Sequence, residues 1–180
     1  MNSIRHGAVP ILFAFALAGA TAAARADDSC VDFKWDVSKE RALFAGVPAA
    51  LKGGKDPASA PIVIPNRLYT LHLEAQDSVA FSVPPAKKPS ASPAYAGVAT
   101  LKIPAPGSYR VSVDLPIWID VVSQGTLVAA KDYQGQHACG APHKIVEFEL
   151  LGTQPFIVQF SNAAADSLSL TVTPSPARKF

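Results

Sequence analysis

Runs of alternating apolar and polar residues account for most of the chain, and nearly every run stops at a proline, a glycine or a polar turn. An apolar residue at every second position is the period of a β-strand, so one side of each run should face a core. A shift of one residue would bury the intervening polar side chains, so the pattern fixes the inner face. The predicted inner positions are Tyr69, Leu71 and Leu73; Val79, Phe81 and Val83; Ala99, Leu101 and Ile103; Tyr109, Val111 and Val113; Ile117, Ile119 and Val121; Val146, Phe148 and Leu150; Phe156, Val158 and Phe160; and Leu168, Leu170 and Val172.

Short connections with turn-forming residues separate these runs. The segments PAPG at 104–107, SQG at 123–125 and GTQP at 152–155 carry residues typical of tight turns. Eight or nine short strands at a spacing of about ten residues are typical of two antiparallel sheets packed face to face. We therefore expect an all-β fold, an antiparallel β-sandwich or jelly roll. The proline- and lysine-rich stretch 84–93 is expected to be a solvated loop.

One short N-terminal helix is expected beside the sandwich. The stretch 36–46 reads DVSKERALFAG, in which Asp36 or Ser38 can cap the first turn and Gly46 can end the helix. No internal repeat divides the sequence, so residues 27–180 are expected to form a single domain.

The first 26 residues have the layout of a secretory signal peptide. Arg5 precedes an uncharged apolar run at 8–20, and Ala24-Arg25-Ala26 forms a small-x-small cleavage site. The apolar run is too short to span a bilayer, so no membrane span is expected after cleavage. We expect a periplasmic or secreted protein. Its net charge of +2 is lost with Arg5 and Arg25, which leaves no basic surface for nucleic acid.

Cys30 and Cys139 are the two cysteines of the chain. In an oxidising compartment such a pair usually forms a disulfide, which here would close a loop of about a hundred residues. The chain-entropy model values such a link at roughly 4–5 kcal/mol. Cys30 lies too far past the cleavage site to be the lipidated cysteine of a lipoprotein.

The stretch YQGQHACGAPH at 133–143 also allows a metal site. His137, Cys139 and His143 have side chains that bind zinc or copper. No CxxC or HExxH spacing is present, and an oxidised Cys139 cannot bind a metal. The alternative to a metal-free protein is therefore a metal-dependent enzyme or metal carrier that uses His72, His137, His143 and Glu147.

Catalytic signals are weak elsewhere in the sequence. No G-x-S-x-G motif is present, and no serine stands beside a histidine. Glu147 and Glu149 share one strand face, which is the usual pattern of a solvated surface. We expect no catalytic residue and no cofactor.

Trp118 breaks the apolar phase between Ile117 and Ile119 and is followed by Asp120. An outward tryptophan beside an acid can form a platform for a sugar or a peptide, and it can equally pack beneath the N-terminal arm together with Trp35. We favour the packing interpretation. The candidate binding surface is Trp118, Asp120, Tyr133, His137 and His143.

Two resemblances bear on the fold and the function. The segment YAGVATLKIPAPGSYRVSVDLPIWIDVV resembles bacterial pre-peptidase C-terminal domains and related jelly-roll modules, mainly through Gly107 and Tyr109. This resemblance implies a β-sandwich with an accessory, non-catalytic role.

The second resemblance rests on WDV at 35–37 and YQGQHACGAPHK at 133–144. Together they are similar to a group of short exported proteobacterial proteins, some of which carry the label homogentisate 1,2-dioxygenase. That enzyme family has a cupin scaffold with iron held by two histidines and a glutamate. His137, His143 and Glu147 are of these residue types, but their spacing and the scaffold differ from that family.

The sequence thus predicts an exported, single-domain β-sandwich that binds or supports a protein, peptide or glycan of the cell envelope. Its contact surface is expected at the end that carries residues 131–143. A metal-dependent enzyme is the alternative.

Overall fold

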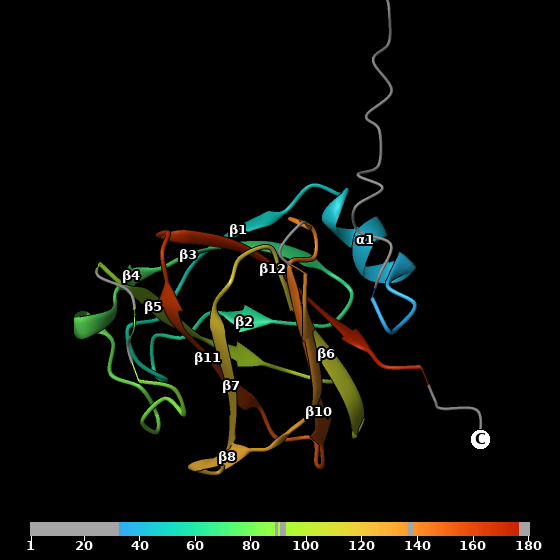
Figure 1. Cartoon of the computed structure of the whole chain (residues 1–180). Coiled ribbons are helices and arrows are strands. Elements are labelled where there is room, and N and C mark those ends of the chain that lie inside the picture. The colour runs from blue at the N-terminus through green and yellow to red at the C-terminus, as the bar shows by residue number, and fades with distance from the viewer. Residues whose placement is uncertain (1–32, 89, 91–92, 137–138, 177–180) are drawn as a thin grey trace, which may run out of the picture.

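The computed structural model describes residues 33–88, 90, 93–136 and 139–176 and confirms an all-β sandwich (Figure 1). Sheet A contains six strands in the order β1-β3-β12-β6-β10-β9, and sheet B contains β2-β5-β11-β7-β8, with β4 paired to β5. Only the pairs β1–β3 and β2–β5 are parallel in this part of the chain. The strands of sheet A are β1 (Ala49–Lys52), β3 (Leu68–His72), β6 (Gly107–Val113), β9 (Ala130–Gly135), β10 (Lys144–Leu150) and β12 (Ser167–Pro174). Those of sheet B are β2 (Ile62–Val63), β4 (Glu74–Ala75), β5 (Tyr95–Leu101), β7 (Trp118–Ser123), β8 (Thr126–Val128) and β11 (Phe156–Ala163).

The hydrophobic core lies between the two sheets. Seven of the eight predicted alternating runs place their apolar residues in it, in the predicted phase. Phe148 from sheet A and Phe156 and Phe160 from sheet B belong to this core, and all three side chains are fully buried. The alternation therefore identified the inner face of both sheets correctly.

The predicted strand at 78–83 is wrong. This segment follows a short 3-10 helix, η2 (Gln76–Ser78), and crosses the outer face of sheet B. Val79 and Phe81 pack there in a second, smaller apolar cluster with Ala96, Val98 and Ile157. The backbone N–H groups of Ser82 and Val83 donate to the side-chain oxygen of Gln159, at 2.8 and 3.3 Å. The buried side-chain amide of Gln159 thus provides the backbone hydrogen bonds that a paired strand would have provided.

The strands that the sequence analysis missed lie at sheet edges. They are β1, β2, β4, β8 and β9, none longer than six residues. An edge strand buries little of its surface, so it needs no sustained apolar alternation and leaves a weak sequence signal.

The predicted helix is confirmed as α1 (Ser38–Phe44), which packs on β12. The Asp36 carboxylate accepts the backbone N–H of Ser38 at 2.9 Å, and the hydrogen bonds from Ser38 hold the pKa of Asp36 below its usual value. The helix ends where the N–H of Gly46 donates to the carbonyl of Leu43 at 2.9 Å. Figure 1 shows α1 beside one end of sheet A.

Candidate functional site

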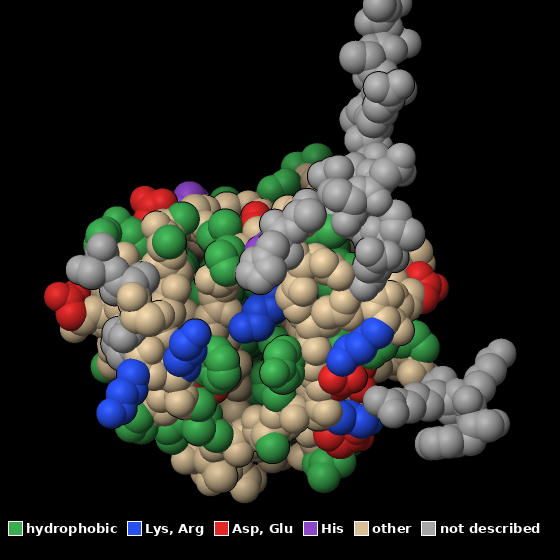
Figure 2. All heavy atoms as spheres, viewed as in Figure 1, with side chains coloured by type: hydrophobic (Ala, Val, Ile, Leu, Met, Phe, Trp, Pro, Cys, Tyr) green, Lys and Arg blue, Asp and Glu red, His purple; other side chains and the backbone are tan. Residues whose placement is uncertain are grey.

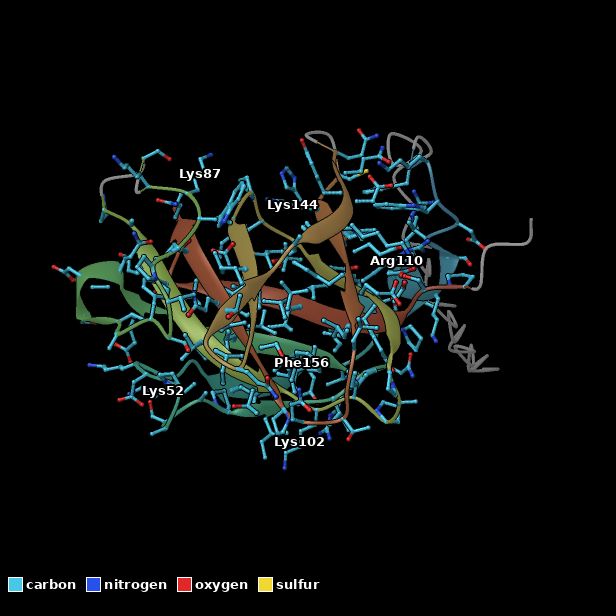
Figure 3. The ribbon with its side chains drawn as sticks, turned by 90° about the horizontal axis from the view of Figure 1, so that it is seen from below. Lys52, Lys87, Lys102, Arg110, Lys144 and Phe156 are labelled. Carbon is cyan, nitrogen blue, oxygen red and sulfur yellow. The ribbon has the colours of Figure 1, made fainter. Side chains whose placement is uncertain are left out.

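A pocket of about 300 Å³ lies where β7 and β10 begin and β9 ends. Figure 3 shows Lys87 and Lys144 at the same edge of the molecule, away from Lys52 and Lys102. Five separate segments build the pocket, so its residues are brought together only by the fold. They are Pro116, Ile117 and Trp118 around the start of β7; Tyr133 and Gly135 of β9; His143 and Lys144 at the start of β10; Asn162 of β11; and Lys87 and Ser90 of the 84–93 loop.

Trp118 is the central side chain of this site. The ammonium nitrogens of Lys144 and Lys87 lie 5.0 and 5.7 Å from the centre of its ring. Both distances fall within the range of a cation–π interaction. The indole Nε1–H donates to Oδ1 of Asp120 at 3.0 Å. The ring is therefore fixed in place by a carboxylate at its edge and attracts two cations.

Asp120 is only 7% exposed and lies outside the pocket lining. Its Oδ2 accepts the backbone N–H of Ala86 at 3.1 Å, while Oδ1 accepts the indole of Trp118. Both oxygens thus have a donor within the protein. Asp120 therefore positions Trp118 and the 84–93 loop from behind the pocket, where a ligand does not reach it.

Lys144 is held at the pocket by its ammonium group, which donates to the carbonyl of Ile117 at 2.8 Å. Burial lowers its pKa, the positive charge of Lys87 lowers it further, and the negative charge of Asp120 acts in the opposite sense. Two cations are therefore kept near each other at a partly buried position, which disfavours the charged state of Lys144.

Buried side chains of sheet B hold the loop that carries Lys87. Gln159 accepts from Ser82 and Val83, and its Nε2 donates to the carbonyl of Val83 at 3.1 Å. Asn162 accepts the N–H of Ser90 at 3.0 Å. The sequence-based interpretation of 84–93 as a solvated loop is therefore incomplete, because polar side chains beneath it anchor its backbone.

Replacing Asn162 with glycine should loosen this loop. The substitution removes the amide that accepts from Ser90 and donates weakly to the carbonyls of Lys87 and Lys88, but it suits the positive φ of 62° at this position. A loss of about 1–2 kcal/mol in local stability raises the open population about 5–30-fold. Tryptic cleavage after Lys87 under native conditions should accelerate by that factor, whereas Lys88 precedes a proline and is not a trypsin site.

Asn66→Gly is the matched control for this substitution. Asn66 also has a positive φ, of 64°. Its backbone N–H donates to the carbonyl of Val172 rather than to a residue of the 84–93 loop. Equal cleavage rates in Asn162→Gly and the control would contradict the anchoring role of the amide.

The predicted binding residues have different placements. Trp118, Tyr133 and His143 all line the pocket, and Tyr133 is 67% exposed. Asp120 lies behind Trp118, and His137 lies outside the described residues. The expected packing of Trp118 with Trp35 is not what the contacts show, because Trp35 stacks instead on Arg110 of sheet A, 4.9 Å from its guanidinium carbon.

Sequence reasoning missed Lys87, Lys144, Ser90 and Asn162. Lys87 looks like one of several solvated lysines in a proline-rich segment, and Lys144 stands at the start of a strand. The one available signal was Trp118, whose position out of phase with the apolar residues placed it away from the core.

The described residues of the alternative metal site, His72, His143 and Glu147, do not form a metal site, and His137 lies outside the described residues. His72 on β3 pairs with Ser167 on the neighbouring strand β12. Glu147 on β10 lies level with Thr173 of β12, through Arg110 on the strand between them. The two side chains are thus about 20 Å apart along the strands and three strand spacings, about 14 Å, across the sheet. Nδ1 of His143 lies 3.0 Å from the carbonyl oxygen of Cys139. Within the described residues, no three His, Cys, Asp or Glu side chains gather as metal ligands would.

Glu147 is not solvated, contrary to the sequence-based interpretation. It is 3% exposed, because the N-terminal arm (residues 33–37) and α1 lie over the outer face of sheet A here. Its Oε2 accepts from Nε of Arg110 at 3.2 Å and from the hydroxyl of Ser175 at 2.9 Å. Glu149 remains exposed, and hydrogen bonds from Ser108 and Lys131 lower its pKa.

No family model matches the chain, and no curated protein is similar to it. Of the helices in the described part of the chain, none has the length and apolar character needed to cross a bilayer.

Proposed function

We propose that this chain is an exported, non-catalytic binding module whose ligand site is the pocket around Trp118. The observation that supports this proposal most strongly is the fixed indole ring with two lysine ammonium groups within 6 Å of its centre. Aromatic rings and a few convergent polar groups at a concave surface are typical of ligand sites. The face of the molecule in Figure 2 carries lysine and arginine side chains around a group of hydrophobic side chains.

The composition of the pocket favours binding over chemistry. The carboxylate of Asp120 is buried and lies outside the pocket lining, so it is poorly placed to act as a general base on a ligand. The neutral polar groups of Ser90, Tyr133 and Asn162 can exchange hydrogen bonds with a ligand without a change in protonation.

Export is part of the same proposal. It rests on the signal-peptide layout of residues 1–26, which lie outside the described residues, and it places the protein in the periplasm or outside the cell. We also propose the Cys30–Cys139 disulfide. Cys30 lies outside the described residues, whereas Cys139 is 2% exposed, and no described cysteine is free.

A fluorescence screen tests the binding proposal. The chain has two tryptophans, so a Trp35→Phe variant leaves Trp118 as the sole indole reporter. The phenyl ring keeps an aromatic face over Arg110. Neutral sugars, acidic sugars, amino acids and short peptides are titrated up to millimolar concentration, and at least one class should change the emission of Trp118. Unchanged emission with every class would overturn the proposal.

A further inference from the structure

We propose that the pocket binds an acidic sugar, with its anionic group at the ammonium groups of Lys87 and Lys144. This inference rests on the proposed function, because it names the ligand class of the same site. It is carried by an excess of positive charge beside neutral hydrogen-bonding groups and aromatic rings.

The charges of the pocket do not balance. Lys87 and Lys144 both approach Trp118, and no carboxylate oxygen of the described residues lies within 4.0 Å of either ammonium nitrogen. The nearest acid in the arrangement, Asp120, uses its two oxygens on Trp118 and Ala86. An anion placed between the two lysines would remove their mutual repulsion and form charge-assisted hydrogen bonds with both.

The rest of the pocket suits a small polyhydroxylated ligand. The phenol of Tyr133, the hydroxyl of Ser90 and the amide of Asn162 are neutral groups that can pair with sugar hydroxyls. Trp118 and Tyr133 supply rings that are apolar on their faces and polar at one edge. The volume of about 300 Å³ lies at the lower end of the range for small-molecule pockets. A hydrophobic or cationic ligand would desolvate the two ammonium groups without supplying a negative charge to either of them.

The test uses titrations of the Trp35→Phe protein with glucuronate, glucose 6-phosphate, glucose and inorganic phosphate. Glucuronate or glucose 6-phosphate should bind at least about tenfold more tightly than glucose, because a charge-assisted contact contributes more than a neutral one. The stronger of the two shows whether the natural anion is a carboxylate or a phosphate. Affinity should also fall as salt concentration rises.

Lysine variants locate the binding. Lys144→Gln and, separately, Lys87→Gln should each weaken binding of the acidic sugar at least about tenfold. Lys87 comes from an exposed loop, so its replacement provides a test even where the Lys144 variant folds poorly. Lys102→Gln is the matched control, because it removes the same charge at an exposed position on the other side of the molecule (Figure 3).

Several results would overturn the inference. The first is an equal affinity for glucose and for the acidic sugars. The second is an affinity for the acidic sugar that is unchanged in both lysine variants. The third is binding of inorganic phosphate and of no sugar, which would indicate an adventitious ion only. A response of Trp118 to peptides or neutral sugars but not to acidic sugars would overturn this inference and leave the binding module in place. No response to any class would overturn both.

Discussion

Arg110→Met should lower the free energy of unfolding by about 3–5 kcal/mol, the cost of breaking a buried ion pair from one side. Arg110 is 6% exposed and lies between two buried acids, with Nε 3.2 Å from Glu147 and Nη1 3.8 Å from Glu40. Methionine fills most of the space of the apolar stem but supplies no charge. Glu40 would then be buried without the Arg110 cation, and Glu147 would keep only the ammonium group of Lys131, 3.7 Å from its Oε1.

The same substitution should also weaken the attachment of the N-terminal arm. Nη1 of Arg110 donates to the carbonyl of Asp36 at 3.1 Å, and the guanidinium stacks on Trp35. Glu40 on α1 accepts from the hydroxyl of Thr173 at 2.5 Å. Arg110 thus joins the arm and the helix to sheet A, and its loss removes contacts on both sides.

Urea unfolding followed by circular dichroism measures this change, with Arg67→Met as the control. Arg67 is an exposed arginine whose guanidinium carbon lies 5.6 Å from the ring centre of Tyr69, so its replacement removes the same charge and one cation–π contact. The control should lose less than about 1 kcal/mol. A loss below about 1 kcal/mol in Arg110→Met as well would show that the buried cluster adds no net stability.

The inner faces of the sandwich could be predicted because the pattern that determines them is local. A residue such as Val111 or Phe148 is buried in the core by its own strand geometry, which the apolar alternation records directly. The outer faces depend on partners far away in sequence. Glu147 is buried because Arg110, 37 residues earlier, and the N-terminal arm lie against it, and no local pattern encodes that contact.

The candidate site was only partly predictable for the same reason. Trp118 was recognisable, because a large aromatic residue between Ile117 and Ile119 interrupts the alternation of apolar and polar residues expected in a strand. Lys87 could not be distinguished from a solvated lysine, because its position depends on the hydrogen bonds of Asp120 and Asn162 to the loop. Those acceptors follow Lys87 by more than thirty residues.

Replacing Cys139 with alanine should lower the free energy of unfolding by about 4–5 kcal/mol, if the proposed disulfide with Cys30 closes a loop of about a hundred residues. Cys139 alone does not decide the matter. Its side chain is 2% exposed, so its truncation would cost some stability even as a thiol. Its carbonyl oxygen also lies 3.0 Å from Nδ1 of His143, which the substitution leaves in place.

The decisive variant is therefore Cys30→Ala, compared with Cys139→Ala and the double replacement in urea unfolding. A disulfide is lost completely when either cysteine is replaced. Each single replacement should therefore lower the free energy of unfolding almost as much as the double replacement does, and the three variants should be about equally stable. Intact mass after alkylation under denaturing conditions should show no reactive thiol in the wild type and one in each single variant. Two independent thiols would instead give two alkylations, a Cys30→Ala variant as stable as the wild type, and additive losses. In that case the loop at 133–143 would depend on its own hydrogen bonds, such as those from Cys139 N–H to Gln136 and from His143 N–H to Val113, at 3.2 and 2.8 Å.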